Sequence, residues 1–106
     1  MTGSHNGSDL QQGIKRVPFF LFKDEWMELQ IIEHAYERMQ QYNVTLKMLT
    51  DTLSNPEDIL PANYNRKIYQ KGLDGYMLRV IVEEYINVIR VITVYKAERD
   101  RYAIQI

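Results

Sequence analysis

The sequence contains no cysteine, which excludes disulfides, thiolate nucleophiles and cysteine-ligated metal centres. Its two histidines, His5 and His34, lie far apart in the chain, and this separation predicts no metal site. The five glycines form no phosphate-binding loop, and Gly72 and Gly75 are predicted to be turn residues. We therefore expect the protein to use neither a metal ion nor an organic cofactor.

Long apolar runs are also missing. The most apolar early stretch, Val17 to Phe22, contains a proline and is too short for a signal-peptide core or a membrane span. We therefore expect a cytoplasmic protein with no membrane association, and the lack of cysteine is typical of a reducing compartment. At 106 residues, with 45% hydrophobic and 25% charged residues, the chain is long enough for one globular domain.

The chain has no basic excess, because its formal net charge is −1. The charge is nevertheless uneven: residues 1–63 carry 5 Lys/Arg against 9 Asp/Glu, whereas residues 64–106 carry 8 against 5. The second half can therefore present a basic surface. Proteins that bind nucleic acid by neutralising phosphates usually have a clearer excess of positive charge, so this balance weakens a nucleic-acid-binding function without excluding it.

The first quarter of the chain divides into a tail and an arm. Residues 1–13 are polar and rich in Gly and Ser, which predicts a disordered tail ahead of a single domain over residues 14–106. Residues 14–27 form an aromatic arm in which Pro18 favours an edge or irregular segment. We expect this arm to pack either on the domain or on a second copy of the chain. In the second case residues 17–26 would form a homodimer contact.

Two helices are predicted after the arm. Apolar side chains recur at three- and four-residue spacing from Glu28 to about Tyr42, namely at Leu29, Ile32, Tyr36 and Met39. Met27 to Ile31 also fits a short first strand, and both alternatives stay open. Thr45 is a good N-cap for a second helix that should end at Ser54-Asn55-Pro56, because the residue before a proline resists the helical conformation. Residues 56–65 are predicted to be a loop.

Three antiparallel strands are predicted at residues 66–71, 76–84 and 88–95. Alternation places Tyr76, Leu78, Val80 and Val82 on one face of the second strand. In the third strand it places Val88, Arg90, Ile92 and Val94 on a shared face. Residues 96–106 fit either a last edge strand or a short helix. This order predicts an α+β fold with two N-terminal helices packed on one face of a three- to five-stranded antiparallel sheet.

Several short motifs occur in a fixed order over residues 28–96. They are His34-Ala35-Tyr36-Glu37-Arg38-Met39, Asn55-Pro56, Leu78-Arg79-Val80-Ile81-Val82 and Val91-Ile92-Thr93-Val94-Tyr95. This order resembles a bacterial domain family of unknown function that looks related to the RelE and BrnT toxins. The resemblance implies a RelE-like fold, a metal-independent endoribonuclease that cuts RNA by 2′-hydroxyl attack, and neutralisation by an antitoxin protein.

The candidate catalytic residues follow from that implied chemistry. His34 and Arg38 are four positions apart and therefore lie on one side of the predicted helix. Such a ribonuclease needs a base for the 2′-hydroxyl proton and a cation for the phosphorane, which a histidine and an arginine supply. His34 is then the acid or base, with Arg38, Arg66 and Arg79 holding phosphate and Tyr95 assisting. The alternative is that His34 hydrogen-bonds the sheet and Arg38 pairs with a carboxylate.

A second hypothesis gives the same scaffold no catalytic role. Arg79 and Arg90 interrupt apolar strands, so each either binds RNA phosphate or pairs with Glu83, Glu84 or Glu28. The near-neutral charge, the aromatic arm and the eight tyrosines are typical of an interaction surface. The chain would then be a catalytically inactive protein-binding or homodimeric module.

Overall fold

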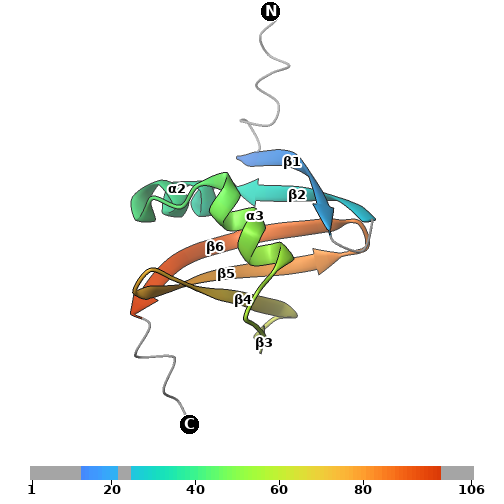
Figure 1. Cartoon of the computed structure of the whole chain (residues 1–106). Coiled ribbons are helices and arrows are strands. Elements are labelled where there is room, and N and C mark those ends of the chain that lie inside the picture. Colours follow the sequence, from blue (N-terminus) through green and yellow to red (C-terminus); the bar gives the residue numbers. More distant parts are fainter. Residues whose placement is uncertain (1–12, 22–24, 99–106) are drawn as a thin grey trace, which may run out of the picture.

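The computed structural model describes residues 13–21 and 25–98, which form six strands and two helices (Figure 1). The predicted tail lies outside the described residues except for Gly13, and so do residues 99–106 of the C-terminal segment. In chain order the elements are β1 (Ile14–Leu21), β2 (Glu25–Ile32), α2 (Glu33–Tyr42), α3 (Leu46–Ser54), β3 (Asp58–Ala62), β4 (Arg66–Leu73), β5 (Tyr76–Tyr85) and β6 (Val88–Glu98). Neither helix is long or apolar enough to cross a membrane.

All six strands join one mixed sheet in the order β1-β2-β6-β5-β4-β3. Neighbouring strands are antiparallel except β2 and β6, which pair in parallel through residues 28–31 and 88–91. The α+β class is confirmed, but the predicted architecture is wrong. The helices are not N-terminal, because the arm precedes them as the hairpin β1–β2, and the sheet is neither purely antiparallel nor limited to five strands.

Residues 28–32 are strand rather than the start of the first helix, which is the alternative that the sequence left open. Leu29 and Ile31 are buried and alternate with the more exposed Glu28 and Gln30, which is the period of a strand. The apolar spacing fits both periods here. Pairing decides the outcome, because this backbone lies between β1 and β6 and is bonded on both sides.

The predicted helix signals hold at the other three boundaries. Asn43 adopts the left-handed conformation, with φ of 57°, and ends α2. The hydroxyl of Thr45 accepts a hydrogen bond from the backbone N–H of Met48 at 3.1 Å and caps α3. The second helix ends at Ser54, within the predicted stretch of residues 54–56 and ahead of Pro56.

The predicted loop at residues 56–65 contains the edge strand β3, which pairs with β4. Pro61 lies in this strand, where the outer edge requires no ladder donor. In β6 the predicted face is also wrong at one end. A bulge opposite Ile81 and Val82 inserts one extra residue, so Val94 joins Ile89 and Val91 instead of Val88 and Arg90.

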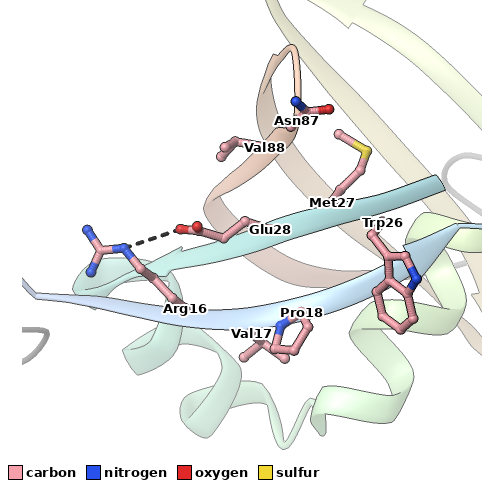
Figure 2. A pocket seen from close by; sticks show the side chains of 8 residues that line it. All are labelled: Arg16, Val17, Pro18, Trp26, Met27, Glu28, Asn87 and Val88. Carbon is pink, nitrogen blue, oxygen red and sulfur yellow. Dashed lines mark ion pairs between the residues drawn. The ribbon is translucent and has the colours of Figure 1, made fainter.

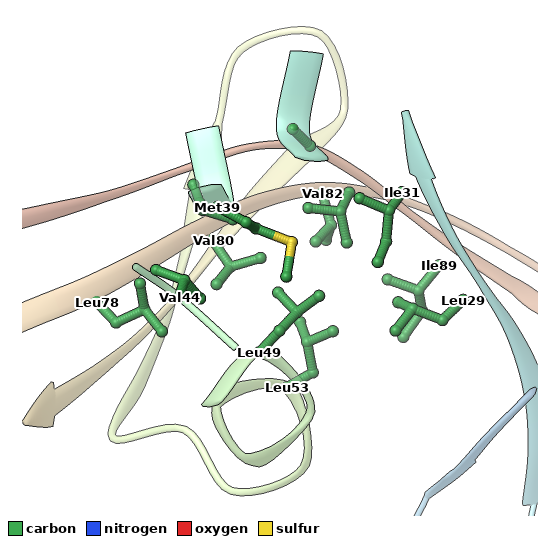
Figure 3. Close-up of a cluster of buried hydrophobic side chains, with 13 residues drawn as sticks. Leu29, Ile31, Met39, Val44, Leu49, Leu53, Leu78, Val80, Val82 and Ile89 are labelled. Carbon is green, nitrogen blue, oxygen red and sulfur yellow. The ribbon is translucent and has the colours of Figure 1, made fainter. Parts of the chain in front are cut away.

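The core lies between the helices and one face of the sheet. Both helices lie on the same side (Figure 1), and Met39, Leu49 and Leu53 point toward the apolar side chains of the strands (Figure 3). The buried strand residues of this layer are Leu29, Ile31, Leu78, Val80, Val82, Ile89, Val91 and Val94. We call this side of the sheet the helix face and the opposite side the open face.

Candidate functional site

Strand arginines and strand lysines lie on opposite faces of the sheet. Within the described strands, the arginines are at positions that alternate with the core residues and therefore lie on the open face: Arg16, Arg66, Arg79 and Arg90. The strand lysines pair with core residues on the helix face: Lys15, Lys67, Lys71 and Lys96. The guanidinium group of arginine, unlike the ammonium group of lysine, is planar and can bind a carboxylate or phosphate through two hydrogen bonds at once. The open face is therefore the better candidate site.

A row of polar side chains crosses the open face from β1 to β4. At one end, Arg16 Nε lies 3.2 Å from a carboxylate oxygen of Glu28, which also accepts a hydrogen bond from Gln30 at 2.8 Å. The guanidinium of Arg90 donates to Gln30 Oε1 at 3.0 Å and lies 3.9 Å from Glu83. This part of the row joins the N-terminal hairpin β1–β2 to β5 and β6, which come much later in the sequence.

In the other half of the row, over β6, β5 and β4, the side chain of Glu83 contacts several neighbours at once. It accepts hydrogen bonds from Arg66 Nε at 3.1 Å and from the hydroxyl of Tyr85 at 2.7 Å. Arg90 completes the cluster by lying over the ring of Tyr85, 5.4 Å from its centroid. The hydrogen bond from Tyr85, followed by the contacts with Arg66, lowers the pKa of Glu83 below its ordinary value of 4.5. The same hydrogen bond to Glu83 raises the pKa of Tyr85.

The cluster around Glu83 predicts a specific acid dependence of stability. Because its folded-state pKa is lowered, Glu83 stabilises the fold above its unfolded pKa of about 4.5, and this contribution is lost as the pH falls through the lower folded value. Glu83→Gln should therefore lower the free energy of unfolding at pH 7 and make it less dependent on pH below about 4.5. Urea unfolding at several pH values tests this. Asp74→Asn in the exposed β4–β5 turn is the control, and an equal change in both variants would contradict the prediction.

The structure separates the predicted catalytic residues into two groups. Arg66, Arg79 and Tyr95 lie on the open face, where the Arg79 guanidinium is 5.6 Å from the centroid of the Tyr95 ring. His34 and Arg38 belong to α2 on the opposite side of the sheet. His34 is exposed in the first turn of the helix, and Arg38 donates a hydrogen bond to Gln41 at 2.6 Å. The five residues therefore do not form one cluster.

Access also differs between the arginines of the open face. Arg79 is only 8% exposed, whereas Arg66 and Arg90 each have side chains that are 36% exposed. Of the two readings of Arg90, pairing with Glu83 is the one that the structure contains. The roles of Arg16 and Gln30 were not predicted from the sequence. The only sequence signal for these residues is the alternation of polar and apolar side chains within a strand. In β2 this alternation was obscured because the apolar residues also fit helical spacing.

An open groove of about 600 Å³ adjoins the polar row where β1 and β2 meet the β5–β6 turn (Figure 2). It is lined by Arg16, Val17, Pro18, Trp26, Met27, Glu28, Asn87 and Val88. Trp26 is 64% exposed, which is unusual for a residue of this size. A second cavity of about 830 Å³ lies at the other end of the sheet, between Met48, Glu57 and residues 72–76. Among the described residues, no group of three or more His, Cys, Asp or Glu is placed to hold a metal ion.

Comparison with known proteins adds one finding to this geometry. Residues 31–96, which include both helices, β3 to β5 and nearly all of β6, match a family described as a domain of unknown function, DUF4258. The hairpin β1–β2 lies almost entirely outside the matched segment. No curated protein and no solved structure matched the chain, and the match establishes no relation to the RelE or BrnT toxins. Because the match covers more than half of the sequence, the chain belongs to the DUF4258 family.

Proposed function

We propose that this protein is a protein-binding module whose binding surface is the open face of the sheet. The observation that supports it is the row of arginines on this face, each placed against a carboxylate, amide or aromatic group of its own chain. Arginine and aromatic residues are enriched at the centres of protein interfaces, where lysine is depleted. The arginine side chains that are already held in place lose little further conformational freedom on binding.

The same contacts disfavour RNA as the ligand. Glu28 and Glu83 lie between the arginines, so an RNA backbone laid along the row would meet carboxylates as well as cations. Affinity for nucleic acid depends on the number of phosphates that are neutralised. A mixed row of charges supplies little net attraction, whereas a protein partner can place opposite charges against each sign.

A metal-independent endoribonuclease is the second candidate, and one observation favours it. Arg66, Arg79 and Tyr95, three of the residues that the RelE-like resemblance implies, share the open face. In this alternative Tyr95 and the two arginines would contact the scissile phosphate, an antitoxin protein would cover the same face, and His34 would take no part. RNA cleavage is therefore the activity that distinguishes this candidate from a protein-binding module.

The first test is incubation of the purified protein with single-stranded RNA in EDTA. We expect the RNA to stay intact and its fluorescence anisotropy to stay unchanged at physiological salt. Cleavage that falls at least about a hundredfold in Arg66→Ala and Tyr95→Phe, but not in His34→Ala, would replace the proposal with the endoribonuclease. His34→Ala is the matched control because His34 lies on the other side of the sheet.

The second test places a photo-crosslinking amino acid at Tyr85 or at Tyr36. These tyrosines are similarly exposed, at 51% and 38%, but Tyr85 lies on the open face and Tyr36 on α2. We expect protein adducts of defined mass from position 85 and none from position 36. Adducts from neither position, or from both equally, would count against a binding surface on the open face.

A further inference from the structure

We infer that a second copy of the chain covers the open face, with a two-fold axis running along the strands between β5 and β6. This inference rests on the proposed function and names its partner. The line between β6 and β5 is the centre of the sheet order, with three strands on each side. Rotation about it exchanges β6 with β5, β2 with β4 and β1 with β3, and it leaves each residue at the same level along the strands.

Charges near this axis are complementary to themselves under that rotation. Arg90 and Glu83 are cross-strand partners on either side of the axis, so they lie at one level. The rotation places Arg90 of one copy opposite Glu83 of the second copy, and the reverse. The four groups then form a square in which positive and negative charges alternate. An axis placed over β6 or over β5 would instead set Arg90 against Arg90 or Glu83 against Glu83.

The next strands outward follow the same rule. Arg66 of β4 is the cross-strand partner of Glu83, and Gln30 of β2 is level with Arg90. Rotation sets Arg66 opposite Gln30 of the second copy, whose side chain holds the Glu28 carboxylate at 2.8 Å. An arginine thus meets an amide and a carboxylate that already lie together. The contacts are therefore attractive on the two strands on each side of the axis, β6 and β2 on one side and β5 and β4 on the other.

An apolar row lies beside the charged one. On the open face, one step along the strands from Glu83 and Arg66, are Ile81, Ile68 and Leu60 on three successive strands. Thr93 of β6 is paired with Ile81 and faces Ile81 of the second copy under the rotation. Sheets that pack face to face bury such rows between them, with strand directions within about 30° of each other. Burial of these side chains supplies a non-directional driving force that the ion pairs lack.

A third observation lies on the other side of the charged row. Tyr85 pairs with Val88, so the rotation sets the exposed Tyr85 of one copy opposite Val88 of the second copy. Val88 forms one wall of the groove beside Trp26. The groove thereby receives an aromatic side chain of which the hydroxyl group is already bonded to Glu83.

The sheet edges are poorer sites for self-association than this face. The outer strands β1 and β3 each contain a proline, Pro18 and Pro61, and each carries charged residues, including Lys15 and Asp58. Proline and charge on edge strands hinder pairing with another chain. A second copy of this protein is therefore expected to stack on the sheet and not to extend it.

Sedimentation equilibrium of the full chain over a series of concentrations is the first experiment. We expect a reversible dimer, and a monomer at every concentration up to about 100 µM would overturn the inference. If such a monomer still gives adducts from position 85 with another protein, only the second copy is excluded and the proposed binding surface stands. Absence of all adducts would overturn the proposed function as well.

Complementary charge reversal tests the axis itself. Arg90→Glu sets two glutamates against each other in a homodimer, and Glu83→Arg sets two arginines against each other. Each variant alone should raise the dimer Kd at least about tenfold, which corresponds to about 1.4 kcal/mol. In an equimolar mixture each Arg–Glu contact across the axis is restored, so we expect a heterodimer. Folded variants that stay monomeric when mixed would overturn this arrangement.

A second pair of variants keeps the test valid if the charge reversals unfold the chain. Leu60 and Ile59 are adjacent in β3 and similarly exposed, at 37% and 48%, but Leu60 lies on the open face and Ile59 on the helix face. Leu60→Lys should weaken the dimer at least about fivefold, and Ile59→Lys should leave its Kd unchanged. Equal effects, or an effect of Ile59→Lys alone, would overturn the inference.

Discussion

Replacement of Leu49 by alanine is expected to lower the free energy of unfolding by about 3 kcal/mol. Leu49 lies in α3, is fully buried and points into the layer between the helices and the sheet (Figure 3). The substitution removes apolar atoms that are shielded from water and leaves a cavity that the rigid sheet beneath cannot close. In a chain of this size, such a loss is a large fraction of the total stability.

Leu46→Ala is the matched control for this experiment. Leu46 belongs to the same helix, undergoes the same chemical change, and is 43% exposed. We expect a loss of less than about 0.5 kcal/mol, because little apolar surface is newly exposed and no cavity forms. Urea unfolding followed by circular dichroism measures both variants. Equal losses would show that α3 is stabilised by its own helical propensity and not by packing on the sheet.

Sequence patterns predicted those elements whose signals are local. Alternating apolar residues in β5 placed Leu78, Val80 and Val82 on one face, and the structure confirms this placement. Thr45 and Asn43 marked helix ends because capping depends on a few neighbouring residues. These signals require no knowledge of what lies beside the segment in space.

The errors arise where the pairing of strands, and not a local signal, decides the structure. Residues 28–32 satisfy a helical and a strand period equally, and the parallel pairing with β6, some sixty positions away, selects the strand. The bulge between β5 and β6 moves Val94 to the helix face, and no residue type marks it in the sequence. Strand β3 was missed because it is short, exposed and contains Pro61.

The candidate site follows the same division. The sequence suggested that Arg90 pairs with a carboxylate, and the structure contains the contact with Glu83. It did not predict that Arg66 shares this carboxylate, since that depends on the register between β4 and β5. The sequence also grouped His34 with Arg66 and Arg79 in one site, whereas the helix covers the face opposite to these arginines. Residue types were predictable, and their grouping required the sheet register.

The second large loss of stability is expected where β2 pairs in parallel with β6. Leu29 is fully buried in β2 and pairs with Ile89 of β6 and Val17 of β1. Leu29→Ala should lower the free energy of unfolding by about 3 kcal/mol, because it opens a cavity where the hairpin joins the main core. If the hairpin β1–β2 merely lay against the domain, Leu29→Ala would lower the free energy of unfolding by less than about 1 kcal/mol. Urea unfolding separates the two cases.

Val17→Ala is the control within the same hairpin, since Val17 is only partly buried and packs at the border of the core. We expect it to cost about 1 kcal/mol, roughly a third of the loss at Leu29. Both variants should still unfold in a single transition by fluorescence of Trp26 and by circular dichroism, because β2 shares its core with both helices. Two separated transitions would mean that β1–β2 folds independently of residues 31–96, the segment that matches the family. A single transition would show that the hairpin β1–β2 and residues 31–96 unfold as one unit. The folded domain would then include two strands that lie almost wholly outside the segment matched by the family.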